Sequence, residues 1–193
     1  MKHDRNKKVE ILAGKTADDY HGGGAAFFEK AAGGILKNDA FLKCRNYIQH
    51  GKTSTYKHCL EVAKMCDKLG RFLNVKDRES MIRAALLHDF FLYDWHNGHN
   101  SWHGFTHPAA AENAKKHFNV SEKEYSMIQT HMWPLTLFHP PKYKEGWLIC
   151  AADKIISVKE IFKAALHRPR RRLPAESNAL KHTIPRYRYE MSK

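Results

Sequence analysis

The sequence lacks the long apolar runs and targeting segments that mark membrane and secreted proteins. No stretch approaches the roughly 20 apolar residues that cross a bilayer. Residues 1–15 carry seven charged side chains and have no apolar core of the kind a secretory signal requires. We therefore expect a cytoplasmic protein with no membrane partner.

Paired cysteine motifs, internal repeats and strand-like alternation are missing as well. The four cysteines include no C-x-x-C pair, which argues against a zinc knuckle or a disulfide framework. We expect Cys44, Cys59, Cys66 and Cys150 to be small buried side chains. Because no useful stretch alternates apolar and polar residues, helices must supply the core.

Positive charge is abundant but concentrated at the two ends of the chain. The net charge is +13, of which residues 163–193 contribute +7 and residues 1–15 contribute +3. The run RPRRR (168–172) raises the alternative of a basic nucleic-acid-binding protein whose histidines hold a structural metal. The middle of the chain is nearly balanced, however, and contains no recognised nucleic-acid-binding module.

Helical periodicity predicts one all-α domain of about six helices. Residues 34–166 are expected to form this domain, between a glycine-rich, flexible segment at 1–33 and a basic, poorly ordered tail at 167–193. The predicted helices span residues 35–50, 55–73, 77–89, 108–118, 121–131 and 144–165.

Two of these helices are assigned buried faces. The helix at 77–89 is apolar all round, which is typical of a central helix. In the last helix, one apolar stripe is predicted to face the core. It consists of Trp147, Leu148, Cys150, Ala151, Ile155, Val158 and Phe162.

The sharpest chemical signal is the His88-Asp89 pair at the end of the central helix. An unpaired carboxylate among large apolar side chains is strongly unfavourable, so both groups need partners. His58 belongs to the packed face of the helix at 55–73, and Asp153 interrupts an apolar stretch of the last helix. Imidazole and carboxylate groups together suit Fe, Mn, Co, Ni or Zn better than Mg. We predict one or two such divalent transition metal ions.

The order of a histidine, a His-Asp pair and a final aspartate on successive helices resembles the signature of the HD superfamily of metal-dependent phosphohydrolases. The segment YKHCLEVA (56–63) is similar to the first-histidine helix of that family. AALLHDFF (84–91) is similar to its His-Asp helix and ICAADKI (149–155) to its final-aspartate helix. The resemblance spans about residues 35–162 and implies an HD-domain helical bundle with the metal site at its centre.

Two further segments resemble the binuclear, six-ligand branches of the superfamily. THPAAAENA (106–114) is similar to a segment that supplies one extra histidine ligand, and IQTHM (128–132) to the helix that supplies the next. The G-Y-P element of the cyclic-dinucleotide enzymes is absent, so their substrate is not carried over. The metal ligands implied in this way are His58, His88, Asp89, His107, His131 and Asp153.

The resemblance also implies an activity, the hydrolysis of a phosphate ester or anhydride by metal-activated water. The expected substrate is a nucleotide or a related phosphorylated small molecule. Asp89 is implied to bind metal and also to orient the attacking water. His103 and Lys154 are further candidates for catalysis, as a leaving-group acid or a phosphate contact. An alternative on the same fold and ligands is a mixed-valent di-iron oxygenase.

Overall fold

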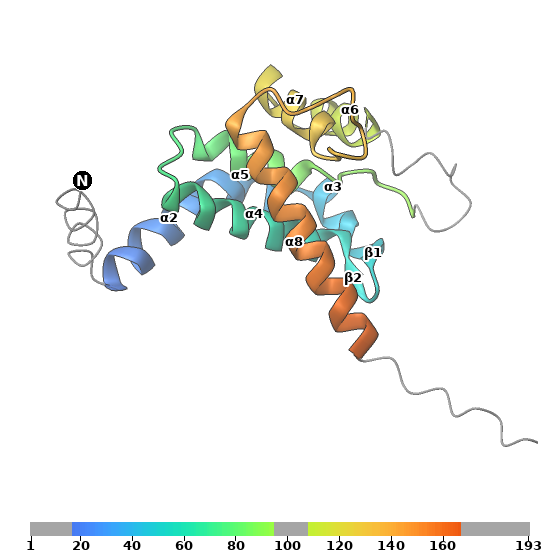
Figure 1. Ribbon diagram of the computed structural model, residues 1–193, viewed down its shortest axis with the longest axis horizontal. Coiled ribbons are helices and arrows are strands. Elements are labelled where there is room, and N and C mark those ends of the chain that lie inside the picture. Colours follow the sequence, from blue (N-terminus) through green and yellow to red (C-terminus); the bar gives the residue numbers. More distant parts are fainter. Residues whose placement is uncertain (1–16, 95–107, 167–193) are drawn as a thin grey trace, which may run out of the picture.

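The protein is a bundle of helices with one short hairpin at its side (Figure 1). The computed structural model describes residues 17–94 and 108–166, the first seven of them as backbone only. The architecture confirms the predicted all-α class. In chain order the elements are α2 (Ala17–Leu36), α3 (Asp39–Leu42), the 3-10 helix η1 (Lys43–Asn46), β1 (Ile48–His50), β2 (Thr53–Ser54), α4 (Thr55–Phe72), α5 (Arg78–Leu87), α6 (Pro108–His117), α7 (Glu122–Thr130) and α8 (Lys144–Leu166).

Helix α5 lies at the centre, as its apolar sequence predicts. The Asp77 side chain accepts a hydrogen bond from the Ser80 amide and so caps the start of α5. Helices α2, α4, α7 and α8 all pack against α5. Its fully buried side chains are Met81, Ile82, Ala84, Ala85, Leu86 and Leu87.

The glycine-rich segment that precedes residue 34 is helical from Ala17 onward. Glycine lowers helix propensity, so the sequence itself favours a flexible segment. Packing reverses that preference, because Ala31, Ala32 and Ile35 are buried in the core next to α5. Helix α2 therefore runs across the boundary expected at residues 33 and 34.

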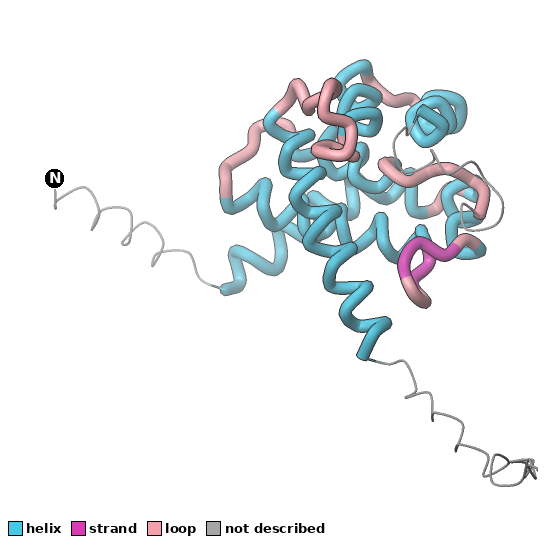
Figure 2. Tube along the Cα trace, turned by 45° about the vertical axis from the view of Figure 1, so that its right-hand side comes forward, coloured by secondary structure: helices cyan, strands magenta, loops and turns pink. Residues whose placement is uncertain are grey.

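The helix predicted at residues 35–50 is replaced by short elements that end in a hairpin. Strands β1 and β2 pair antiparallel, with Ile48 opposite Ser54. The turn between them uses Gly51 at a φ of +61°, in the left-handed region that glycine tolerates. The hairpin lies against the C-terminal half of α8 (Figure 2).

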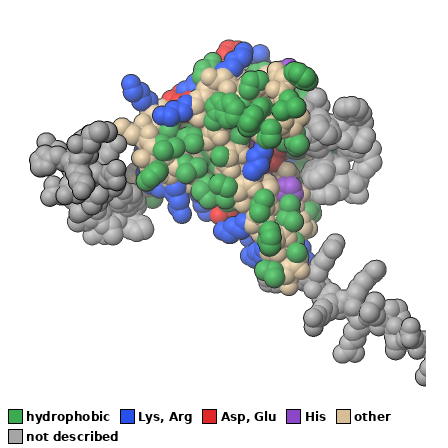
Figure 3. Space-filling model, in the orientation of Figure 1, with side chains coloured by type: hydrophobic (Ala, Val, Ile, Leu, Met, Phe, Trp, Pro, Cys, Tyr) green, Lys and Arg blue, Asp and Glu red, His purple; other side chains and the backbone are tan. Residues whose placement is uncertain are grey.

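The prediction for the buried face of α8 is wrong for most of the stripe. Ile155 is 52% exposed, Val158 54% and Phe162 67%, and hydrophobic side chains line the outer face of α8 in Figure 3. The rule that apolar residues face inward fails here because the inner face carries a polar cluster described below. Cys150 is the one member of the stripe that is buried. The buried residues of α8 are Glu145, Gly146, Ile149, Cys150, Ala152, Asp153 and Ile156.

The cysteines behave as predicted, since Cys44, Cys59, Cys66 and Cys150 are all free and buried. Burial raises the pKa of the Cys150 thiol to about 11, which keeps it protonated at neutral pH. None of the described helices is both long enough and apolar enough to span a membrane.

Candidate metal centre

Three histidines reach one point from three different helices because of where each helix begins or ends. Ser54 caps α4, and its hydroxyl accepts a hydrogen bond from the Lys57 amide, so His58 falls in the first turn. His88 is the C-cap residue of α5 and His131 the C-cap residue of α7. All three side chains are buried, with relative exposures of 0%, 0% and 1%.

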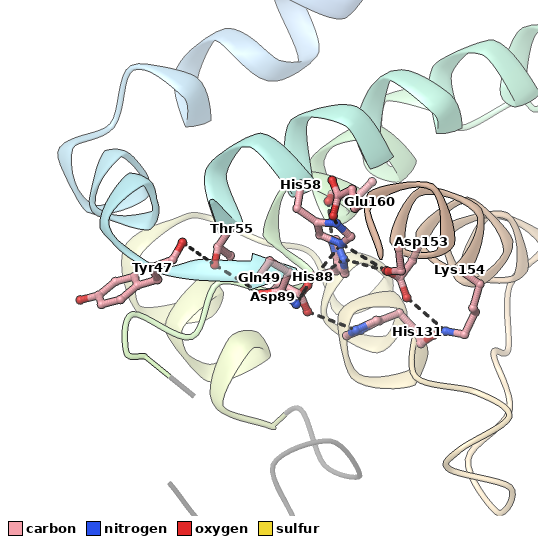
Figure 4. A network of polar contacts seen from close by, with 12 residues as sticks. Tyr47, Gln49, Thr55, His58, His88, Asp89, His131, Asp153, Lys154 and Glu160 are labelled. Atoms are coloured by element: carbon pink, nitrogen blue, oxygen red, sulfur yellow. Dashed lines mark hydrogen bonds and ion pairs between the residues drawn. The ribbon is translucent and has the colours of Figure 1, made fainter. Parts of the chain in front are cut away.

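Two aspartates complete the cluster (Figure 4). Nε2 of His58 lies 3.2 Å from Asp153 Oδ1 and 3.5 Å from Asp89 Oδ2. Nε2 of His88 lies 3.2 Å from Asp89 Oδ2 and 3.7 Å from Asp153 Oδ1. Nε2 of His131 lies 3.5 Å from Asp89 Oδ1. Five side chains from four helical segments therefore point at a common centre.

Each histidine turns the same nitrogen inward. Nδ1 of His88 lies 2.8 Å from the Ala85 carbonyl oxygen, and Nδ1 of His131 lies 2.6 Å from the Ile128 carbonyl oxygen. A carbonyl oxygen only accepts hydrogen bonds, so Nδ1 carries the proton in both rings. In the neutral ring the lone pair is then on Nε2 and faces the two carboxylates. This is the arrangement in which imidazole binds a metal.

The aspartates are held from outside the cluster as well. Nε2 of Gln49 in β1 donates a hydrogen bond of 2.6 Å to Asp89 Oδ2. The Ser157 hydroxyl donates to Asp153 Oδ1 at 3.2 Å, and Lys154 Nζ donates to Asp153 Oδ2 at the same distance. The cluster thus has a fixed geometry before any ion is considered.

Without a metal, protons must offset the charge of these carboxylates. Burial lowers the pKa of His58, but hydrogen bonds with Asp153 and Glu160 outweigh burial and raise that pKa to about 10. Burial also opposes charge on His88, yet the nearby Asp89 carboxylate raises the pKa of His88 well above its usual value.

The two aspartates respond in the opposite sense. Burial acts to raise the pKa of Asp89, but the neighbouring His88 and His131 hold it well below its usual value. A hydrogen bond from His58 and the charge of the nearby His88 overcome burial in the same way and lower the pKa of Asp153. The metal-free cluster therefore holds ionised Asp89 and Asp153 beside protonated His58 and His88.

The donor set fits a divalent transition metal. Nε2 of His88 is buried and has no hydrogen-bond partner among the described residues, although two carboxylate oxygens lie within 4 Å of it. A cation at the centre would satisfy that nitrogen and separate it from the carboxylates. Among these five cluster residues, two sets of donor atoms lie close enough together to hold an ion, within 4.8 Å of one another. They are His58, His88 and Asp89, and His88, His131 and Asp153.

The structure brings together most of the residues predicted from the sequence. His58, His88, Asp89, His131 and Asp153 form the cluster, as the distances above establish. His103 and His107 lie outside the described residues. Lys154 adjoins the cluster, but its Nζ is bound to the His131 carbonyl oxygen at 2.9 Å as well as to Asp153.

Two residues that contact the cluster escaped the sequence analysis. Glu160 lies behind His58, with Oε2 3.0 Å from Nδ1 of His58. Its signal was its position seven residues after Asp153, which places both on one helical face. Gln49 lies in a strand of three residues, too short to produce a recognisable pattern. His50, next to it, stacks edge-on against His58 at 5.5 Å between ring centroids.

Comparison with known proteins agrees with the geometry. The model of the HD domain family matches residues 55–157, just over half of the chain. This range begins at the first residue of α4 and includes His58, the His88-Asp89 pair and Asp153. The chain matched no curated protein and no solved structure in the same comparisons. On the family match and the converging histidines and aspartates, the chain belongs to the HD domain family and so to the superfamily of metal-dependent phosphohydrolases.

Proposed function

We propose that this protein hydrolyses a phosphate ester or anhydride of a nucleotide or a related phosphorylated small molecule. The observation that carries the proposal is the inward orientation of three histidine Nε2 atoms around two buried carboxylates. A purely structural ion pair does not require every imidazole to present the same nitrogen. Membership of the HD family supports hydrolysis as the reaction.

The residues proposed to hold metal are His58, His88, Asp89, His131 and Asp153, together with His107 from outside the described residues. Iron, manganese, cobalt, nickel and zinc all accept this combination of nitrogen and oxygen donors. The metal supplies Lewis-acid chemistry, in that it acidifies water and offsets charge on phosphoryl oxygens.

The two oxygens of Asp89 support a site for two ions. Oδ2 faces His58 and His88, whereas Oδ1 faces His131. A carboxylate that offers one oxygen to each side can bridge two cations.

The chain's own groups have distinct tasks in this proposal. Asp89 orients the attacking water, while Gln49 holds the Asp89 carboxylate in place through Oδ2. Lys154 donates hydrogen bonds to Asp153 and to the His131 carbonyl, which ties the end of α7 to α8, and we retain it as a candidate phosphate contact. His103 remains the candidate acid for the leaving group.

The test combines metal analysis with a substrate panel. Protein purified without oxygen is analysed for bound metals and then assayed against nucleoside mono-, di- and triphosphates, with Asp89→Ala as the control. We expect phosphate release that requires metal and disappears in Asp89→Ala. Turnover that survives this substitution would refute the mechanism, and oxygen uptake by the iron-loaded protein would favour the oxygenase alternative. The cytoplasmic location and the domain limits 34–166 remain predictions.

A further inference from the structure

A carboxylate outside the proposed ligand set lies directly behind His58. Glu160 follows Asp153 by about two turns of α8 and shares its inner face. The Glu160 side chain is only 10% exposed. Its Oε2 lies 3.0 Å from Nδ1 of His58, although 102 positions separate the two residues in the chain. Figure 4 shows Glu160 on the far side of the His58 ring from Asp89.

An imidazole can serve a metal through only one nitrogen at a time in this cluster. Nε2 of His58 faces Asp153 and Asp89, so this nitrogen must offer its lone pair to the ion. The neutral ring has one proton, which must then reside on Nδ1. A buried N–H needs an acceptor, and the acceptor chosen decides which way the ring is turned.

His58 cannot obtain this acceptor in the way that His88 and His131 do. Those two residues follow the last turns of α5 and α7, where backbone carbonyl groups have no partner within the helix. Each uses the carbonyl of the residue three positions earlier. His58 lies in the first turn of α4, where the carbonyl groups are engaged in the helix. A side chain must therefore supply the acceptor.

We propose that Glu160 is a positioning residue of the metal centre, which accepts the Nδ1 proton of His58 and so directs Nε2 of His58 to the ion. The proposal rests on the proposed metal site at the cluster. A carboxylate acceptor also increases the electron density of the imidazole, which strengthens its bond to a metal.

The surroundings of Glu160 raise one competing role, that of a direct ligand. Donor atoms of His50, His58 and Glu160 lie within 4.8 Å of one another. A metal bound there would need the Nδ1 lone pair of His58, and the ring would then serve ions through both nitrogens. A positioning role does not require both nitrogens of His58 to bind ions. The positioning role and the direct-ligand role therefore differ in the number of ions bound.

Metal binding tests the proposal independently of turnover. Metal-free wild-type protein, Glu160→Ala and Glu160→Gln are titrated with Mn²⁺ and Zn²⁺ in competition with a chelating indicator. The matched control is Glu145→Gln, because Glu145 is a buried acid of the same helix that pairs with Lys123 at 3.0 Å, away from His58. Circular dichroism verifies that each variant is folded.

We expect Glu160→Ala to weaken metal binding by about 10- to 100-fold. Glu160→Gln should lose less metal affinity, because the side-chain carbonyl oxygen of glutamine still accepts the Nδ1 proton of His58. Glu145→Gln should bind metal as the wild type does. The number of ions per chain should not change. In nitrogen-15 spectra of the zinc-loaded protein, His58 should hold its proton on Nδ1 in the wild type and in Glu160→Gln.

Three results would overturn the proposal. They are wild-type metal affinity in Glu160→Ala, a loss of affinity in Glu160→Gln as large as that in Glu160→Ala, and one bound ion fewer in Glu160→Ala. The last of these would identify Glu160 as a direct ligand. If wild-type protein binds no metal at all, the proposed function fails first, so the two failures are distinguishable.

Discussion

The burial of the two faces of α8 is the opposite of what the polarity of their side chains predicts. The inner face carries the carboxylates of Asp153 and Glu160, and their side chains are only 12% and 10% exposed. The outer face carries Ile155, Val158 and Phe162, each more than half exposed. The inner face is buried because His58 and His88 provide partners for its acids. Partner geometry, more than hydrophobicity, has set the orientation of this helix.

Removal of an inner-face acid should have the largest effect. Asp153→Ala deletes the carboxylate closest to Nε2 of His58, and we expect metal affinity to fall by more than the roughly 100-fold that loss of a ligand's supporting partner can cost. Ile155→Ala, two residues along on the outer face, should leave the affinity unchanged. Chelator competition measures both. If Asp153→Ala binds metal within tenfold of the wild-type affinity, the expected difference between the two faces is wrong.

Two adjacent isoleucines, one on each face of α8, allow the contribution of each face to the free energy of unfolding to be compared. Ile156 is 4% exposed and Ile155 is 52% exposed. Ile156→Ala should lower the free energy of unfolding by about 2–5 kcal/mol, because it leaves a cavity. Ile155→Ala should change it by no more than about 0.5 kcal/mol. Urea denaturation followed by circular dichroism gives both values, and equal losses would mean that the outer face is also covered.

The hairpin turn allows a test of the packing at the C-terminal end of the inner face of α8. A Cβ atom added to Gly51 would lie 2.5 Å from the Cβ of Ala164 in α8, and the φ of +61° disfavours any other residue. We expect Gly51→Ala to destabilise the protein by about 1–3 kcal/mol. The control is Gly34→Ala in α2, where nothing lies within 4 Å of the added atom. It should raise stability, by up to about 1 kcal/mol. Thermal denaturation that ranks the two variants the other way would contradict this packing.

The pH dependence of stability should reveal the protons held at the inner face. The folded, metal-free protein binds more protons than the unfolded chain at pH values between about 6.5, the usual pKa of histidine, and about 10, the raised pKa of His58. Its free energy of unfolding should therefore fall as the pH rises through this interval. Zinc-loaded protein, whose histidines are neutral, should lack this decline. Urea titrations with and without chelator measure it, and a metal-free protein that gains stability towards pH 10 would contradict the protonated cluster.

The sequence predicted most residues of the cluster because the proposed ligands are separated by regular helices. A histidine or aspartate within an apolar helix is conspicuous, and His58, His88, Asp89, His131 and Asp153 do converge. Residues that support the ligands were harder to recognise. Glu160 resembles an ordinary helical charge, and its position seven residues after Asp153 does not by itself predict the contact with His58.

The fold was predictable in class and in most helix boundaries, but not in three local features. Packing against α5 makes α2 helical despite its glycines. A turn at Gly51 creates a hairpin too short to give a sequence pattern. In α8 the more apolar face was predicted to be buried. All three depend on contacts between distant segments, which local periodicity does not encode.

The positions of His88 and His131 have an electrostatic consequence. Each is the C-cap residue of its helix, so α5 and α7 both end at the cluster. The carbonyl dipoles of a helix place about half a negative charge at its C-terminus. Two helix ends thus add to the field of Asp89 and Asp153, and this field attracts cations and repels anions. In the proposed function, these two helix ends would disfavour an approaching phosphate group, and a bound cation would offset them during recognition of the substrate as well as during its cleavage.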